Sequence, residues 1–241
     1  MSAPNQQTNT EGKNQLLLPR KALALRTVAG IGLFLVVFFV PAGSFRWPQA
    51  WVFLALYLSA VAGFFVWTKK KDPGLLKERI SPQKNVKAWD RKILRVYSLF
   101  LAVLPIVAGL DAVRFRWSHL PFGFNLLGFA GLVLTMLLAF WATRENTFAS
   151  SVVRIQTDRG HRVCSTGPYA YVRHPMYIAV ILMVVSLPPA LGSRYAFIPA
   201  GIIVGLFVLR TALEDKTLKE ELPGYKDYTQ KVRFRLIPGV W

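Results

Sequence analysis

The sequence predicts an all-α protein, a polytopic membrane bundle of about six segments with both ends of the chain on the cytoplasmic side. Hydrophobic residues make up 53% of the 241 residues, and the mean hydropathy is positive. Several apolar runs reach the ~20 residues that an α-helix needs to cross a bilayer. The basic residues gather in alternate loops, and this asymmetry sets the orientation of the runs.

Six apolar segments follow one another along the chain. They are predicted to cover residues 27–40, 50–67, 96–112, 124–143, 176–187 and 195–209. The chain shows no internal repeat, so residues 1–241 are predicted to form one integral membrane domain. Residues 1–20 are polar and are predicted to form a flexible tail, with no cleavable signal peptide.

The fifth segment, residues 176–187, is shorter than the others. As an α-helix it spans about 18 Å at ~1.5 Å per residue, less than the ~30 Å hydrocarbon core of a bilayer. Pro188 and Pro189 follow it directly. Two interpretations stay open: the prolines kink a longer helix, or the last two segments form a helical hairpin that enters the membrane and returns.

The formal net charge of +18 is concentrated on one predicted side of the membrane. Only Arg46, Arg114, Arg116 and Arg194 of the 30 Lys and Arg residues fall in the predicted outer loops. This distribution favours contact with anionic lipid headgroups and a cytoplasmic orientation of both termini. We therefore expect no nucleic-acid partner.

Several common kinds of site are excluded by the residues themselves. A single cysteine, Cys164, rules out an intrachain disulfide and is interpreted as an inert loop thiol. His119, His161 and His174 show no ligand spacing with it, so we expect no metal. The chain also lacks the glycine-rich loops of soluble nucleotide-binding folds and the elbow of serine hydrolases.

The basic loop of residues 69–95 contains apolar side chains that suggest segments lying along the membrane surface. These side chains are Leu75, Leu76, Ile80 and Trp89. Asp90 is interpreted as an N-cap of the third membrane helix.

The segment 167–177 combines prolines, tyrosines and an Arg-His pair, and an apolar run follows it. Pro175 is suited to the first position of a helix, where its missing N–H would have had no partner. Arg173 and His174 then lie at the mouth of a membrane helix. Titratable groups are costly there and usually have a function.

The last apolar segment continues into a charged stretch. Arg210 and Glu214 are four residues apart and share a helix face, so they form either a helix-end ion pair or one wall of a pocket shared with His174 and Tyr177. Residues 222–224 end this helix. Tyr225 and Tyr228 follow among cations, a composition that suits either an adenine ring and a charged ligand or lipid headgroups.

Taken together, these motifs resemble the isoprenylcysteine carboxyl methyltransferase and phospholipid methyltransferase superfamily. The resemblance rests on Gly-Pro-Tyr-x-Tyr-Val-Arg-His-Pro-x-Tyr at 167–177, Glu214 with Leu218, and Pro-Gly-Tyr-x-x-Tyr at 223–228. It covers about the last third of the chain. A stretch in the front half, residues 72–79, is similar to a segment of bacterial members.

The resemblance implies an enzyme that uses S-adenosylmethionine, bound by residues 160–241 at the cytoplasmic face. It implies that seven residues bind this donor: His174, Pro175, Tyr177, Glu214, Leu218, Tyr225 and Tyr228. It makes Arg173 and Arg210 candidates for orienting an anionic acceptor. A carboxylate acceptor needs no base, whereas an amine acceptor needs a proton removed, which His174 or Glu214 could accept. Glu214 could instead bind the ammonium group of the donor. The acceptor is expected to be a prenylcysteine carboxylate, a phospholipid amine or another lipid that enters from the bilayer.

Two alternatives stay open. The end of the chain, residues 231–239, also resembles the NADPH-dependent sterol double-bond reductases, but Met176 stands where those enzymes have Asn. A non-enzymatic membrane scaffold would explain the spans but not the linked motifs. The compact chain without targeting signals favours a prokaryotic inner membrane.

Overall fold

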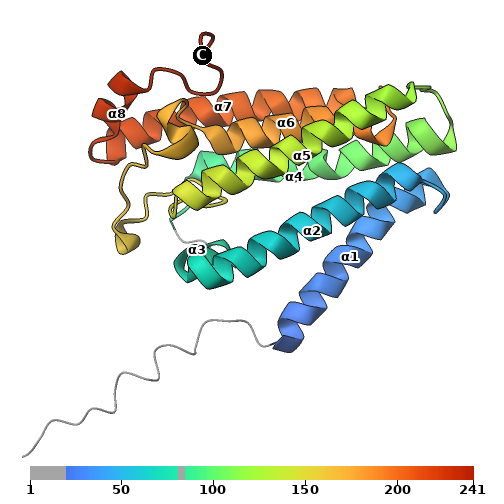
Figure 1. The fold of residues 1–241 in the computed structure, drawn as a ribbon, viewed down its shortest axis with the longest axis horizontal. Helices are drawn as coiled ribbons and strands as arrows, with labels where there is room; N and C mark the ends of the chain where they lie inside the picture. The colour runs from blue at the N-terminus through green and yellow to red at the C-terminus, as the bar shows by residue number, and fades with distance from the viewer. Residues whose placement is uncertain (1–19, 81–84) are drawn as a thin grey trace, which may run out of the picture.

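The computed structural model describes residues 20–80 and 85–241, and this part of the chain is helical without strands (Figure 1). The predicted tail of residues 1–20 lies outside it except for Arg20. The helices are α1 (Arg20–Ala42), α2 (Pro48–Lys71), α3 (Pro73–Ile80), α4 (Ala88–Gly109), α5 (Phe122–Glu145), α6 (Pro175–Leu191), α7 (Phe197–Glu221) and α8 (Tyr225–Lys231).

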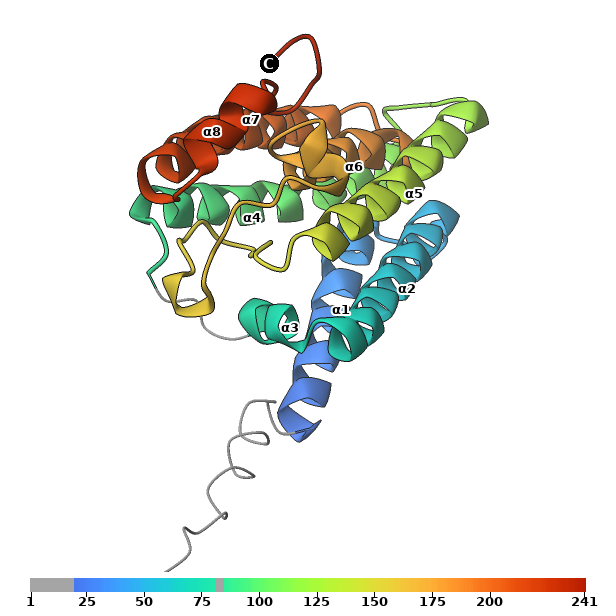
Figure 2. The ribbon, with the colours of Figure 1, turned by 60° about the vertical axis from the view of Figure 1, so that its left-hand side comes forward.

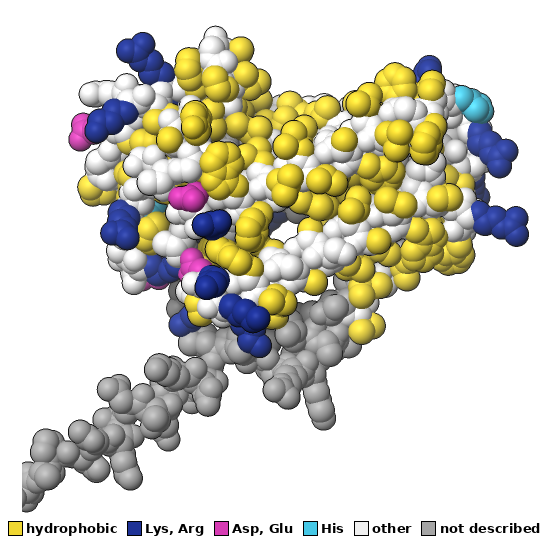
Figure 3. Space-filling model, viewed as in Figure 1, with side chains coloured by type: hydrophobic (Ala, Val, Ile, Leu, Met, Phe, Trp, Pro, Cys, Tyr) yellow, Lys and Arg dark blue, Asp and Glu magenta, His cyan; other side chains and the backbone are white. Residues whose placement is uncertain are grey.

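Four of the described helices are long and apolar enough to cross a membrane: α2, α4 with the turn that follows it, α5 and α7. The apolar part of α1, Val28–Ala42, and α6 are shorter. Figure 3 shows apolar side chains over the middle of the molecule and Lys and Arg side chains toward its ends. The chain is thus an integral membrane protein, while the number of crossings and the sides of the termini stay predictions.

Proline and glycine mark several helix ends. Pro48 and Pro175 occupy first-turn positions of α2 and α6, as their fixed φ allows. Pro188 and Pro189 lie inside the last turns of α6, so the helix does not stop at residue 187. It ends at Leu191 and is capped by Gly192, which adopts a left-handed φ of 80°.

Helices α5 and α6 pack against each other at very short range because two glycines of α5 face α6. A Cβ atom on Gly128 would lie 2.2 Å from the backbone nitrogen of Ala190, and one on Gly131 would lie 2.2 Å from the hydroxyl of Ser186. The fully buried core includes Leu132 of α5. In both ribbon views α4, α5, α6 and α7 lie together as one group (Figures 1 and 2).

A buried carboxylate joins the connections at the end of the bundle away from α8. Asp111 lies in the π-helical turn Leu110–Arg114 and accepts hydrogen bonds from the hydroxyls of Ser118 (2.8 Å) and Ser193 (2.5 Å). It also accepts one from the backbone N–H of Tyr195 at 3.2 Å. These contacts fix the connection between α6 and α7 and so the relative positions of the two helices that build the site.

The structure corrects two expectations for the loop of residues 69–95. Leu75 and Leu76 of α3 are 0% and 5% exposed, so these two pack inside the protein rather than along a membrane surface, whereas Ile80 and Trp89 are half-buried. Asp90 is not an N-cap, because α4 begins at Ala88 with Lys87 as its cap. Asp90 is instead fully buried in the first turn.

Candidate active site

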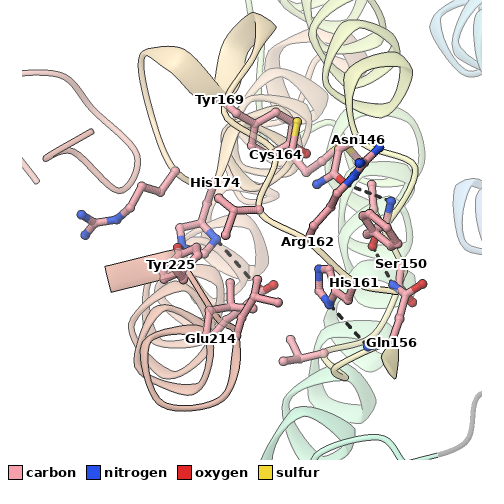
Figure 4. Close-up of a pocket in the computed structure, with 18 of the residues that line it drawn as sticks. Asn146, Ser150, Gln156, His161, Arg162, Cys164, Tyr169, His174, Glu214 and Tyr225 are labelled. Carbon is pink, nitrogen blue, oxygen red and sulfur yellow. Dashed lines mark hydrogen bonds and ion pairs between the residues drawn. The ribbon is translucent and has the colours of Figure 1, made fainter. Parts of the chain in front are cut away.

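A recess lies where the start of α6, the end of α7, α8 and the loop between α5 and α6 meet (Figure 4). Its empty volume is about 790 Å³, which includes the part open to solvent. Seven sequence-predicted residues line it: Arg173, His174, Tyr177, Glu214, Leu218, Tyr225 and Tyr228. Pro175 and Arg210 do not.

The entry to α6 is held by the end of the chain. The backbone N–H of Arg173 donates to the carbonyl of Phe234, and that of His174 donates to the carbonyl of Arg235, both at 3.0 Å. Pro175 follows as the buried first residue of α6, so the backbone turns into the helix directly after these two hydrogen bonds. The Arg-His pair is therefore fixed from two sides.

Asp215 is the charged centre below this entry, although no motif in the sequence indicated it. Its buried carboxylate lies 2.8 Å from Nε of Arg173 and 3.1 Å from Nε of Arg235 and Nζ of Lys219. The Tyr225 hydroxyl donates to it at 3.1 Å. Arg173 thus has a carboxylate partner inside the protein, which it shares with Arg235 and Lys219.

Glu214 differs from its neighbour. The Tyr177 hydroxyl donates a hydrogen bond to its carboxylate, and Nδ1 of His174 lies 4.0 Å from the same oxygen. The His174 and Tyr177 rings are stacked, with centroids 5.5 Å apart. The side chain of Glu214 is 21% exposed and forms no ion pair with a Lys or Arg within 4 Å in the part of the chain that the structure describes. It is a carboxylate available to a cationic ligand.

Arg210 lies behind the recess rather than in it. Its Nε is 2.7 Å from Oδ1 of Asp90 on α4, so its ion-pair partner is not Glu214, as one interpretation of the sequence required. It also donates to the carbonyl of Ser151 at 3.1 Å, and its guanidinium lies 4.9 Å from the ring centroid of Tyr177. Arg210 therefore supports the ring that hydrogen-bonds Glu214.

The loop between α5 and α6 forms the opposite wall and is tied to the front half of the chain. The backbone N–H of Val153 donates to Asp90 at 2.7 Å. Arg154 is paired with Glu78 of α3 and with Asp158, at 2.8 and 2.9 Å. Figure 2 shows α3 below this loop. Residues far from the motifs thus shape the site, and no local pattern in the sequence indicated them.

His161 and Cys164 belong to the same wall. Nδ1 of His161 accepts from the backbone N–H of Gln156 at 3.4 Å. Burial, together with the nearby charges of Arg154 and Arg159, lowers the pKa of His161 to about 4, so the ring is neutral at pH 7. The Cys164 thiol donates to a backbone carbonyl at 3.4 Å and lines the recess.

The tyrosines of α8 and the loop before α6 close the site. Tyr228 donates from its hydroxyl to the carbonyl of Tyr169 at 2.6 Å, and the Tyr225 and Tyr228 rings lie 5.5 Å apart. Burial raises the pKa of both α8 tyrosines well above the usual value, so their phenols stay neutral. Among the described residues no group of three or more His, Cys, Asp or Glu side chains is placed to hold a metal ion.

Apolar helices that end in a charged recess define an integral membrane protein with a site at one end of its bundle. Residues 126–220 match the model of the isoprenylcysteine carboxyl methyltransferase family, which confirms the superfamily resemblance and supports a membrane methyltransferase. The match runs from α5 to the end of α7, so it includes His174 and Glu214 but neither Asp90 nor α8. A search of curated proteins found no match to the chain.

Proposed function

We propose that the chain is an S-adenosylmethionine-dependent methyltransferase that methylates a lipid or lipid-linked acceptor at the cytoplasmic face of a membrane. The observation that carries the proposal is the Glu214 carboxylate in the recess, which contacts Tyr177 and His174 but no Lys or Arg within 4 Å in the described structure. An opposite charge at short range is strongly attracted where water is partly excluded. A cationic ligand such as a sulfonium donor fits this environment.

The residues of the recess suit each part of that donor. Glu214 would bind its positively charged portion, and the neutral rings of Tyr225 and Tyr228 would pack against its adenine. When bound, S-adenosylmethionine supplies an electrophilic methyl group on sulfur. The chain's own contribution is then to hold the acceptor atom in line with that methyl group, which accounts for much of the rate of such reactions.

The proton requirement depends on the acceptor class. A carboxylate is ionised at neutral pH and needs no base. An amine acceptor must lose a proton, and His174 or Glu214 can accept it because their side chains line the recess. If His174 accepts the proton, the Asp215 carboxylate, 3.7 Å from its Nε2, would stabilise the positive charge that the ring gains.

The acceptor is proposed to enter from the bilayer. Large apolar side chains are exposed along α5, among them Leu126, Leu134 and Leu137, and α5 leads into the loop that forms one wall of the recess. A lipid tail can thus stay in the hydrocarbon while its head group reaches the site. A prenylcysteine carboxylate and a phospholipid amine both satisfy this geometry.

Ligand binding to the purified protein in detergent tests the proposal. We expect S-adenosylhomocysteine to bind and NADPH not to bind. Tight NADPH binding without S-adenosylhomocysteine binding would support the reductase alternative, and binding of neither would support the scaffold. Met176, which replaces the reductases' Asn, lines the recess. Its thioether sulfur is a weak acceptor without a donor, so this position has little capacity to bind a polar ligand.

A further inference from the structure

Three arginines line the recess: Arg154, Arg162 and Arg173. Two of them already have carboxylate partners within the protein. Arg154 is paired with Glu78 and Asp158, and Arg173 is paired with Asp215. A guanidinium that already binds a carboxylate in its own fold has little remaining capacity for a ligand's carboxylate.

Arg162 is different. It follows His161 in the loop between α5 and α6, and its side chain is exposed to the recess and to solvent. In the described part of the chain it forms no ion pair within 4 Å and no hydrogen bond. Arg210, which lies behind the recess, is paired with Asp90. Arg162 is therefore the lining guanidinium whose charge and five donors are not used by the protein.

Glu214 is its counterpart, because it is the one carboxylate among the residues that line the recess. Arg162 comes from the loop wall and Glu214 from α7, and Figure 4 shows them on different walls. In the described structure the recess thus has an arginine without an ion pair on one wall and a carboxylate without a Lys or Arg partner on another. Such a site complements a ligand, or a pair of ligands, that carries both charges.

We propose that Arg162 binds the carboxylate of a ligand in this recess. The planar guanidinium fork matches a carboxylate with two parallel hydrogen bonds. The inference rests on the proposed function, and the carboxylate has two possible sources. It belongs either to the amino-acid portion of the methyl donor or to the acceptor.

The donor arm of the test compares two ligands in Arg162→Gln. S-adenosylhomocysteine carries the amino-acid carboxylate, whereas methylthioadenosine keeps the adenosine and the thioether sulfur without it. If the carboxylate is the donor's, we expect the Kd of S-adenosylhomocysteine to rise about 10-fold, as for the loss of a charged hydrogen-bonded pair. The Kd of methylthioadenosine should not change. Arg162→Lys should restore part of the affinity, because it keeps the charge but loses the fork.

The acceptor arm measures the KM of a farnesylated cysteine carboxylate. If the carboxylate is the acceptor's, we expect this KM to rise about 10-fold in Arg162→Gln while S-adenosylhomocysteine binding stays unchanged. Arg144→Gln is the matched control. It removes the same charge from the last turn of α5, where Arg144 is exposed and does not line the recess, and both constants should stay at wild-type values.

The outcomes separate this inference from the function on which it rests. Wild-type protein that binds no S-adenosylhomocysteine would overturn both. Suppose that the wild type binds S-adenosylhomocysteine and that its Kd is unchanged in Arg162→Gln. The role of Arg162 alone is then overturned if the KM of the farnesylated cysteine carboxylate is also unchanged. It is likewise overturned if the protein uses no carboxylate acceptor. The affinity of the wild type for the ligand whose carboxylate Arg162 binds should also fall with rising salt, because the ion pair between them would be partly exposed.

Discussion

Asp90 and Arg210 form a buried ion pair across 120 positions of the chain, with Nε of Arg210 2.7 Å from Oδ1 of Asp90. Asp90 is 0% and Arg210 is 4% exposed. The pair joins the first turn of α4, which lies outside the family match, to the middle of α7. Because Arg210 also lies 4.9 Å from the Tyr177 ring, the front half of the chain supports a residue of the site through this contact.

Asp90→Asn should therefore destabilise the protein. It leaves the Arg210 charge buried without its carboxylate, and breaking a buried pair from one side costs about 3–5 kcal/mol. Thermal unfolding in detergent should show a lower midpoint. The double variant Asp90→Asn/Arg210→Gln removes both charges and should recover part of the loss. A double variant less stable than Asp90→Asn would contradict the importance of the unpaired charge.

His174→Ala and Glu214→Ala should each abolish donor binding and leave a folded protein. Glu214 lines the recess and has no Lys or Arg partner within 4 Å in the described structure, and His174 stacks on Tyr177 beside it. S-adenosylhomocysteine titrations measure the loss, and circular dichroism checks the helix content.

Glu220→Gln is a suitable control for both variants. Glu220 is an exposed residue of the same helix, and its one ion pair is a 3.9 Å contact with Lys216, so the donor should bind as in the wild type. Unchanged affinity in both alanine variants would remove His174 and Glu214 from the binding site.

Cys164→Ser should keep full methyl transfer although Cys164 lines the recess. Its thiol donates to the backbone carbonyl of Glu145 at 3.4 Å, and a serine hydroxyl can donate to the same oxygen. Methyl transfer to the acceptor, measured with radiolabelled donor, should match the wild type. A variant without activity would mean that the thiol itself takes part in the reaction.

The sequence was sufficient to predict the residues whose arrangement is local. His174 and Tyr177 lie within one turn at the start of α6, Leu218 follows Glu214 by one turn of α7, and the helix end after Glu221 is set by the Pro-Gly pair. Periodicity and helix-end chemistry act over a few residues, so a single sequence carries them. The long apolar helices were predictable for the same reason.

The partners of charged residues were not predictable in this way. Arg210 was expected either to pair with Glu214 one turn away or to line a pocket with it, whereas its partner is on α4. Asp215 was overlooked although it binds Arg173 and Arg235. These contacts depend on how the helices pack, and hydrophobic periodicity does not determine which polar side chains meet inside a bundle.

Gly128→Val should destabilise the protein because α5 and α6 have no space for a side chain there. A Cβ would lie 2.2 Å from the backbone of Ala190, so the helices would have to separate, and overpacking of this kind costs about 1–3 kcal/mol or more. Gly123→Ala in the same helix is the control, because nothing lies within 4 Å of its Cβ position. It should be neutral or slightly stabilising. Equal unfolding midpoints for the two variants would contradict the close packing.

His161 should make stability depend on pH between about 4 and 6.5. Burial and the charges of Arg154 and Arg159 lower its pKa to about 4 from the ordinary 6.5. Between these values the unfolded chain binds more protons than the folded one, so the free energy of unfolding rises with pH. The contribution is complete above pH 6.5 and is lost as the pH falls toward 4.

His161→Asn isolates this contribution, because it keeps an acceptor for the Gln156 N–H without the titration. The unfolding midpoint of the wild type minus that of the variant should decrease steadily from pH 7 to pH 4.5. A difference that stays constant over this range would mean that His161 titrates alike in the folded and unfolded states. The folded-state ring would then be more solvated than its contacts indicate, which are the Gln156 N–H and the Phe148 ring, 4.8 Å away.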